Sequence, residues 1–442
     1  MHTMLPMLFA ACAPALAGPQ AFVGATVHPV ASPPIADAVL LIEEGRITAV
    51  GPRGAVVVPP DVEPVDLTGK VIVPGLVDTH SHIGGGGLGE GSGPLQPAIS
   101  AIDSIDPTHV SLERARAGGI TTVNVMPGSG NLIGGQTAYL KLRDASVIDD
   151  LLLCDDRRTE VCGGMKMANG TNPQGEGGYP RTRMGAAAQL RERLLAVKGE
   201  MGSGKKGGLF KKRASAPATL TDPGDEALRQ VLAKERTVHF HTHRADDIAT
   251  ILALREEFDL DIVLHHVSEA WKVADAIGEA QIPCSLIMID SPGGKEEAVE
   301  FRAENGAELE QRGVPVSLHT DDAITDSRLF LRSAGLAVRA GMSEEAALKA
   351  LTLAGAEQMH LEGRVGSLEV GKDADFVVLS GPPLSVYTLV EQTWVEGTKV
   401  FDRANAMDER YAEGGWAVHE RVPALEAAEG PETDQMDEGA SR

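Results

Sequence analysis

Short apolar runs alternate with longer amphipathic stretches through the middle of the chain. The runs have the length of buried strands, and the stretches between them have the apolar spacing and composition of helices. Eight candidate strands cover residues 75–80, 121–126, 146–153, 164–168, 237–243, 261–267, 284–290 and 314–321. Candidate helices cover residues 109–119, 183–198, 246–258, 268–280 and 343–357. This alternation predicts an α/β fold in which residues 71–364 close into a (β/α)8 TIM barrel.

A different pattern flanks this region on both sides. Residues 18–70 contain short Val, Ile and Leu runs separated by turn residues, and residues 365–402 repeat that style. We therefore predict a small composite β-sandwich that is built from both chain ends. The long interruption at residues 202–224 is rich in glycine and lysine, which predicts an exposed loop.

The chain begins with an apolar run that is too short to span a bilayer and ends in the letters ALA at residues 15–17. We expect residues 1–17 to be a signal peptide and the protein to be exported, to the periplasm or the cell envelope. The letters FAAC at residues 9–12 resemble a lipoprotein cleavage box, with Phe9 where Leu is usual, and Cys12 would then carry the lipid. No Lys or Arg precedes the run, so a cytoplasmic location stays open. Cys154 and Cys162 are candidates for a disulfide in an oxidising compartment.

The charge balance excludes some classes of partner. The 442 residues include 63 acidic and 40 basic side chains, a formal net charge of -23. Such a chain repels phosphate backbones and anionic membranes, so we expect no nucleic acid partner. We also expect no transmembrane helix. Acidic residues concentrate in residues 403–442, which predicts a disordered tail.

Histidines accumulate where candidate strands end. Eight of the 13 histidines lie at four strand ends, namely His80, His82, His239, His241, His243, His265, His266 and His319. Reactive groups of a barrel project from the carboxyl ends of its strands, and side chains two residues apart share a face. His80 and His82 can therefore address one ion, and Asp321 shares the face of His319. Imidazoles with a carboxylate suit Zn²⁺, and Fe²⁺ or Mn²⁺ less well.

Five segments in this order resemble the amidohydrolase superfamily, in particular its imidazolonepropionase-like and prolidase-like members. They are PGLVDTHSH, HTHRADDI, LHHVSEA, LHTDD and VGSLEVGKDADFVVL, and the resemblance covers roughly residues 20 to 402. It implies a metal-bearing barrel with a composite β-sandwich. It also implies metal ligands at His80, His82, His241, His266 and Asp321, with catalytic roles for Asp321 and His266.

Lys166, at the end of the fourth candidate strand, leaves the number of ions open. Binuclear members of the superfamily bridge two ions with a carboxylated lysine or a glutamate. If Lys166 bridges, His241 and His266 hold the second ion. Alternatively, Lys166 extends to solvent at the barrel rim. One site is then completed by His80, His82, His241 and Asp321, with His266 next to the water or the substrate.

The resemblance implies hydrolysis of a non-peptide or dipeptide-like C–N amide bond. A divalent ion would activate a hydroxide, and Asp321 would act as general base. A deaminase of a nitrogen heterocycle is the alternative. A catalytically silent scaffold is disfavoured because no expected ligand is missing.

Loops after other strands offer contacts to a small-molecule substrate. The candidates are Asn131, Gln136, Tyr179, Arg183 and Lys295. Arg183 suits a substrate carboxylate, or else packs against its own loop. A homo-oligomer is the general expectation for such barrels.

Overall fold

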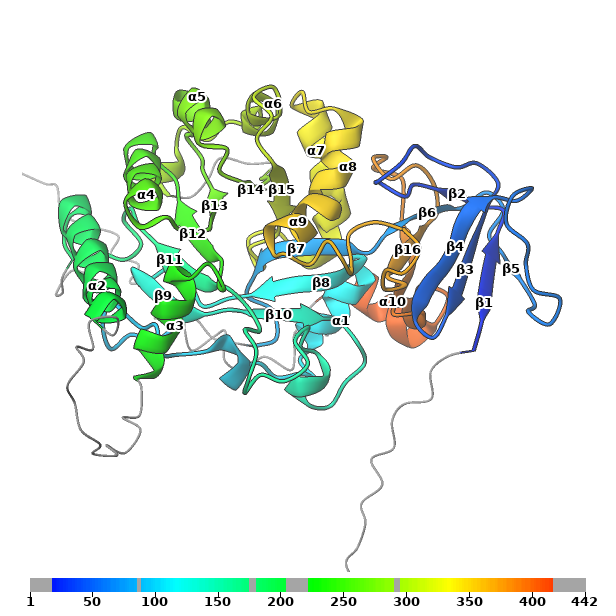
Figure 1. Cartoon of the computed structure of the whole chain (residues 1–442). Coiled ribbons are helices and arrows are strands. Elements are labelled where there is room, and N and C mark those ends of the chain that lie inside the picture. Colours follow the sequence, from blue (N-terminus) through cyan, green and yellow to red (C-terminus); the bar gives the residue numbers. More distant parts are fainter. Residues whose placement is uncertain (1–17, 86–88, 175–179, 204–221, 290–294, 416–442) are drawn as a thin grey trace, which may run out of the picture.

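The computed structural model describes residues 18–85, 89–174, 180–203, 222–289 and 295–415. An α/β region with helices on its outside adjoins a β-rich region, drawn at the right of Figure 1. The predicted signal peptide and most of the predicted loop at residues 202–224 lie outside the described residues. No helix in the part of the chain that the structure describes is long and apolar enough to cross a membrane.

The strands of the α/β region form two hydrogen-bonded sheets. Their orders are β10-β8-β7 and β15-β14-β13-β12-β11-β9. Strands β11 to β15 are all parallel, as are β7 and β8. The bounds are β7 (Leu76–Ser81), β8 (Ile120–Val125), β9 (Ile133–Gln136), β10 (Ala138–Lys141), β11 (Met165–Ala168), β12 (Val238–Thr242), β13 (Ile262–His266), β14 (Cys284–Ile287) and β15 (Val316–His319). The α/β class is confirmed, whereas closure into one eight-stranded ring stays a prediction.

The third candidate strand is wrong. Residues 146–153 form the 3-10 helix η2 (Ile148–Asp150) and a turn, with only an isolated bridge between Leu152 and Leu140. The sheet positions belong instead to β9 and β10, which run antiparallel to β11 and β8. Gly135, at a φ of 122°, gives β9 a backbone that other residues rarely adopt, and this glycine hid the strand in the sequence pattern.

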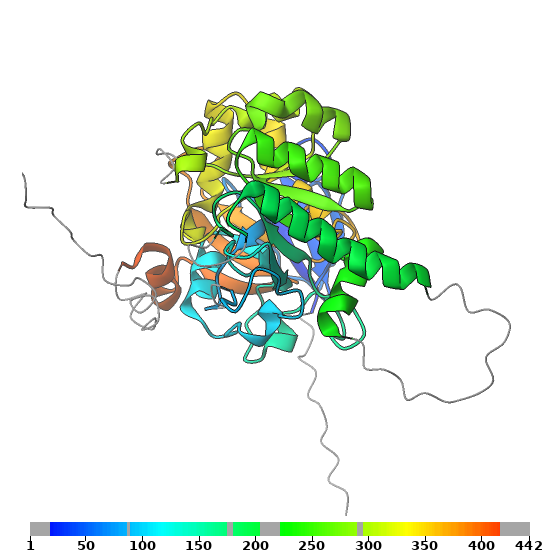
Figure 2. The same ribbon diagram turned by 90° about the vertical axis from the view of Figure 1, so that its left-hand side faces the viewer.

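Helices cover the outer faces of the strands, and the green helices α2, α4 and α5 lie side by side in Figure 2. The bounds are α1 (Val110–Ala117), α2 (Arg183–Ser203), α3 (Pro223–Leu232), α4 (Ala245–Phe258), α5 (Ala270–Ala280), α6 (Asn305–Glu310), α7 (Phe330–Arg339), α8 (Glu344–Ala350) and α9 (Leu353–Gln358). Each candidate helix is present, although residues 343–357 divide into α8 and α9. The pattern missed α3, α6 and α7.

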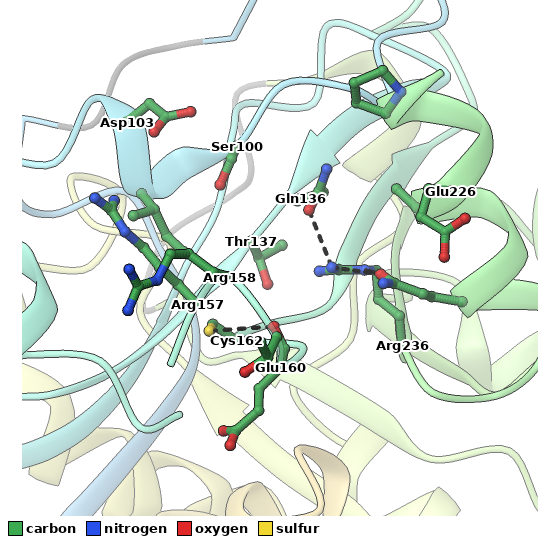
Figure 3. A pocket seen from close by; sticks show the side chains of 15 residues that line it. Ser100, Asp103, Gln136, Thr137, Arg157, Arg158, Glu160, Cys162, Glu226 and Arg236 are labelled. Atoms are coloured by element: carbon green, nitrogen blue, oxygen red, sulfur yellow. Dashed lines mark hydrogen bonds between the residues drawn. The ribbon is translucent and has the colours of Figure 1, made fainter. Parts of the chain in front are cut away.

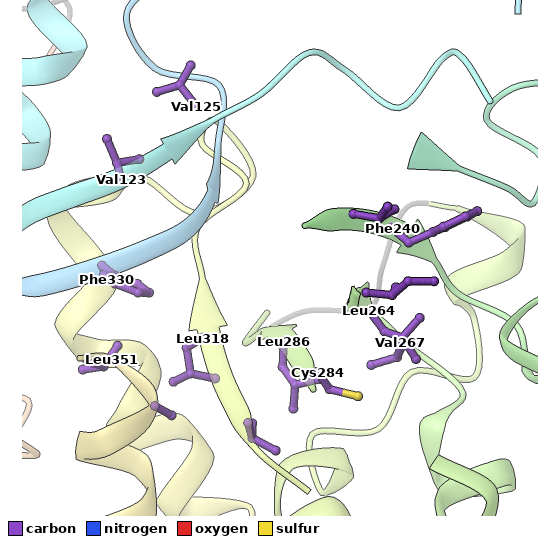
Figure 4. Packing of buried hydrophobic residues seen from close by; sticks show 14 of the residues in the cluster. Val123, Val125, Phe240, Leu264, Val267, Cys284, Leu286, Leu318, Phe330 and Leu351 are labelled. Atoms are coloured by element: carbon purple, nitrogen blue, oxygen red, sulfur yellow. The ribbon is translucent and has the colours of Figure 1, made fainter. Parts of the chain in front are cut away.

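Alternate residues of the central strands face opposite environments. Phe240, Leu264, Leu286 and Leu318 belong to the main apolar cluster, which is shown in part in Figure 4. Several of the residues next to them in sequence are polar and bond to one another across the interior: Ser285 Oγ lies 2.6 Å from Thr79 Oγ1 and 2.7 Å from His319 Nδ1. The apolar faces of the strands pack against the helices, and the polar faces provide the side chains of the candidate site.

The β-rich region consists of two sheets with the orders β4-β3-β1-β5 and β18-β17-β16-β6-β2. In the second sheet, β16 pairs antiparallel with β6, so the two chain ends share hydrogen bonds. The bounds are β1 (Gln20–Val23), β2 (Thr26–Val27), β3 (Ala38–Glu43), β4 (Arg46–Pro52), β5 (Val65–Asp66), β6 (Val71–Pro74), β16 (Phe376–Leu379), β17 (Val390–Val395) and β18 (Thr398–Asp402). A separate composite β-sandwich domain stays a prediction.

Buried charges connect β10 to the segment before β16. Lys141 Nζ donates to Asp373 and, at 2.7 Å, to Asp375, and all three side chains are almost inaccessible to solvent. Buried charges are tolerated when they are paired and hydrogen-bonded in this way. This ion cluster fixes the β-rich region beside the strand that borders β8.

Part of the segment that was predicted to be a disordered tail is helical. Residues 406–413 form the helix α10 (Ala406–Glu413), with Asn405 as its N-cap, and residues 416–442 lie outside the described part. Cys154 and Cys162, the candidates for a disulfide, are bonded to each other. Cys284 is a buried free thiol.

Candidate metal centre

The carboxyl ends of four strands bring the predicted ligands together. His82 Nε2 lies 2.9 Å from Asp321 Oδ1, and His80 Nε2 lies 3.4 Å from the same oxygen. His266 Nε2 lies 3.8 Å from Asp321 Oδ2. The ring of His241 contacts that of His266 with a centroid separation of 4.3 Å. All five residues therefore surround one small volume.

Asp78, which the sequence pattern did not single out, holds the ends of β7 and β15 in place. Its carboxylate accepts hydrogen bonds from the backbone N–H of His80 at 3.2 Å and of Thr320 at 3.1 Å, and from the Thr320 hydroxyl at 2.5 Å. The Asp321 N–H donates to the His80 carbonyl at 2.9 Å. The ligands at these two strand ends are thus fixed relative to each other.

Two of the predicted ligands adopt a left-handed backbone. The φ angles are 70° at His266 and 48° at Asp321. Residues other than glycine pay roughly 1–3 kcal/mol for this region and keep it only where surrounding contacts require it. The turn directs both side chains toward His80 and His82.

Further hydrogen bonds orient the imidazoles. His82 Nδ1 lies 2.8 Å from the Met126 carbonyl oxygen, which accepts its proton. His241 Nδ1 lies 2.9 Å from Ser129 Oγ. Partners of this kind fix the ring orientation. On the other side of the His241 ring, Nε2 lies 3.3 Å from the side-chain amide nitrogen of Asn172.

His243 and His319, which were not among the predicted ligands, extend the cluster of histidines. The ligand atoms of His241, His243 and His266 lie within 4.8 Å of one another, as do those of His80, His266 and His319. The sequence feature that could have identified them is their two-residue spacing, of His243 from His241 and of His319 from Asp321.

The chemistry of this donor set fits a metal ion. The Nε2 atoms of His243, His266 and His319 are buried and have no hydrogen-bond partner among the described residues. Buried polar atoms are rarely left unpaired. Three such atoms in one cluster of imidazoles indicate a position where a metal ion would be bound by the unpaired nitrogens.

Burial also sets the protonation states. It lowers the pKa of His80, His241 and His266 far below the usual value and that of His243 to about 3. Burial alone would raise the pKa of Asp321, but the hydrogen bond from His82 and the nearby positive charges hold it below the usual range. At neutral pH these four histidines are therefore neutral, and Asp321 is an anionic carboxylate.

Lys166 is buried beside these ligands. Its Nζ lies 3.0 Å from His80 Nε2 and 3.2 Å from Met126 Sδ, and its side chain is fully inaccessible. The alternative that Lys166 extends to solvent is therefore wrong. Burial lowers the pKa of its amine to about 7.

Asn131 and Gln136, two of the candidate substrate contacts, have surroundings that differ from each other. Asn131 is buried and donates to the carbonyls of Glu90 at 2.8 Å and Gly93 at 2.7 Å, so it ties loops together. Gln136 pairs with Met165 at the beginning of β11, the end away from the histidines. It lines a pocket of about 650 Å³ with Arg236, which donates to it at 3.1 Å (Figure 3). The structure does not bring Gln136 to the metal centre.

The remaining candidate substrate contacts are Arg183, Lys295 and Tyr179. Arg183 is held by Asp247 at 2.8 Å and Glu297 at 3.3 Å, so two carboxylates already engage its guanidinium. Lys295 lies near enough for its charge to lower the pKa of His243, after the larger effect of burial. Tyr179 lies outside the described residues.

Comparisons with known proteins show the family of the chain. The Amidohydrolase family model matches residues 71–407. An amidohydrolase from Thermotoga maritima MSB8 shares 35% identity and a TM-score of 0.77, covering 87% of this chain and 100% of that one.

Two curated relatives are more distant. The amidohydrolase tasK of Hapsidospora irregularis is 27% identical over 406 residues, which are 82% of this chain but 40% of that protein, so the chain spans less than half of its length. The imidazolonepropionase of Fusobacterium nucleatum subsp. nucleatum is 24% identical over 379 residues, 79% of this chain and 86% of the relative. The chain therefore belongs to the amidohydrolase family, as its sequence predicted, and the expectation of a hydrolase that acts on carbon–nitrogen bonds is confirmed.

Proposed function

We propose that this chain is a zinc-dependent hydrolase that opens the amide bond of a small cyclic amide. The observation that carries the proposal is the convergence of His80, His82 and Asp321. Two imidazole Nε2 atoms lie 3.4 Å and 2.9 Å from one carboxylate oxygen, in the ligand set that zinc prefers. The unpaired Nε2 atom of His266 beside them supports the same conclusion.

The residues can be divided between two ions. His80, His82 and Asp321 would hold the first, and His241 and His266 the second, with Lys166 between them as a carbamate. In that modification the neutral amine attacks carbon dioxide, an N–C bond forms, and one amine proton leaves to solvent. Burial favours it, because a pKa of about 7 gives the amine a substantial neutral fraction at physiological pH.

Asp321 carries the proton transfer. A bound zinc ion would lower the pKa of water to roughly 7 and polarise the substrate carbonyl. Asp321 accepts the proton of the attacking water as the C–O bond forms. It then donates this proton to the leaving nitrogen as the C–N bond breaks. Its depressed pKa keeps it anionic, and His82 fixes its orientation.

The cyclic amide is favoured over a dipeptide by the state of Arg183. A dipeptide needs a cation for its terminal carboxylate, and Arg183 is already paired with Asp247 and Glu297. The imidazolonepropionase of Fusobacterium nucleatum, a curated relative, is named for a cyclic substrate.

A substrate panel tests the reaction class. Zinc-loaded protein is assayed with cyclic amides, Xaa-Pro dipeptides and amino-substituted heterocycles, and ring opening, free amino acids and ammonia are measured separately. We expect ring opening without ammonia. Ammonia release from heterocycles alone would replace the proposal by the deaminase, and no turnover of any class would favour the scaffold.

We also propose that the protein is exported. The disulfide between Cys154 and Cys162 supports this, because disulfides persist in oxidising compartments. Sequencing the amino terminus of the protein from its native cells tests it, since cleavage after residue 17 is expected. The homo-oligomer and the closed barrel are retained as predictions, which scattering in solution and a crystal structure would test.

A further inference from the structure

A row of buried side chains continues from the metal centre through the interior of the fold. His80 Nδ1 lies 3.3 Å from His265 Nδ1. His265 Nε2 lies 3.0 Å from His239 Nδ1, and His239 Nε2 lies 2.8 Å from the Tyr139 hydroxyl. The three histidines are inaccessible and Tyr139 is 8% exposed, so water cannot replace these bonds.

The row ends at a carboxylate near the surface. The side chain of Thr237 lies close enough to the Tyr139 hydroxyl to act on the pKa of this phenol, after the larger effect of burial. Thr237 Oγ1 in turn donates to Asp261 Oδ2 at 2.7 Å, and the exposed ring of His360 contacts the same oxygen at 2.8 Å. Asp261 directly precedes β13, whereas His266 ends it, so the row spans the length of this strand.

The need for a lone pair on His80 gives the row one direction. A metal at Nε2, as proposed above, requires the His80 proton to be on Nδ1, from which it donates to His265. His265 then carries its proton on Nε2 and donates to His239, which donates from Nε2 to Tyr139. The tyrosine hydroxyl is left to donate to Thr237, which donates to Asp261.

We propose that Tyr139, His239 and His265 are positioning residues for the metal ligand His80, anchored by the carboxylate of Asp261. Ligating histidines generally donate the N–H of their other ring nitrogen to a carboxylate or a carbonyl. Here the carboxylate acts through intervening side chains. The opposite direction would place a proton on His80 Nε2 and block the ligand atom.

The variant Tyr139→Phe tests the proposal, which rests on the proposed function through the role of His80. It removes one hydroxyl and keeps the ring. We expect zinc affinity to fall about 10- to 100-fold, measured by competition with a chromophoric chelator on the folded apoprotein. Thr393→Val is the matched control, because it removes a buried hydroxyl that donates to the Arg116 carbonyl, outside the row. Its zinc affinity should equal that of the wild type.

The outcomes are distinguishable. A wild-type zinc affinity in folded Tyr139→Phe overturns the inference and leaves the proposed function standing. If the wild-type protein binds no zinc, both fall. Should Tyr139→Phe not fold, Asp261→Asn removes the charge at the far, partly exposed end. Weaker zinc binding then supports the row, and unchanged binding overturns it.

Discussion

Replacing Asp321 by asparagine is expected to lower kcat by about 10²- to 10⁴-fold, the usual contribution of a general acid–base group. Asparagine keeps the size of the side chain but can neither accept the proton of the attacking water nor return it to the leaving nitrogen. The carboxylate is anionic at neutral pH, since His82 and nearby charges hold its pKa below the usual range against the effect of burial. The measurement is kcat of the zinc-loaded variant with the best substrate of the panel.

The adjacent carboxylate supplies the control. Asp322 accepts from the backbone N–H and the hydroxyl of Ser327 at 2.9 Å and 2.6 Å, which is a structural role. We expect Asp322→Asn to lower the melting temperature and to retain most of kcat. Equal losses of kcat in the two variants, or a wild-type kcat in Asp321→Asn, would contradict the assignment of the base.

Replacing Lys166 by methionine is expected to lower the zinc content from about two ions to about one per chain, as a two-metal site that loses its bridge would. Hydrolysis should fall by at least about 10²-fold, because losing a bridging ligand exceeds the 10- to 100-fold effect of losing an outer partner. The buried position of Lys166, 3.0 Å from His80, is the reason for both expectations. Elemental analysis and kinetics of the same preparation measure them.

Chemical rescue distinguishes a carbamate from a plain amine. Lys166→Ala leaves space for a small carboxylate, so acetate should restore part of its activity but none of that of Lys166→Met. Lys295→Met is the control for zinc content, which should equal that of the wild type, since it removes a nearby exposed lysine that is not a proposed metal ligand. An unchanged zinc content in Lys166→Met would show that the histidines hold the metal without a bridge.

Local periodicity predicted only part of the proposed ligand set, and the resemblance to the amidohydrolase superfamily supplied His241, His266 and Asp321. His80 and His82 have the two-residue spacing that places side chains on one face of a strand. The apolar run before them identified β7. In the structure their Nε2 atoms do converge on Asp321.

The predictions that the structure contradicts failed for a different physical reason. The run at residues 146–153 is as apolar as a strand, but the sheet positions beside β8 and β11 are filled by β10 and by the glycine-containing β9. Arg183 was a candidate for a substrate carboxylate, and contacts across 64 and 114 residues decide that it meets Asp247 and Glu297 instead. Pairings over such distances in sequence leave no periodic signal along the chain.

The metal content of the purified wild-type protein tests the central claim most directly. Elemental analysis should find about two equivalents of a transition metal, chiefly zinc, per chain. Hydrolysis should disappear with the metal on chelation and return when zinc is added. A folded, metal-free protein that still hydrolyses its substrate would contradict the account.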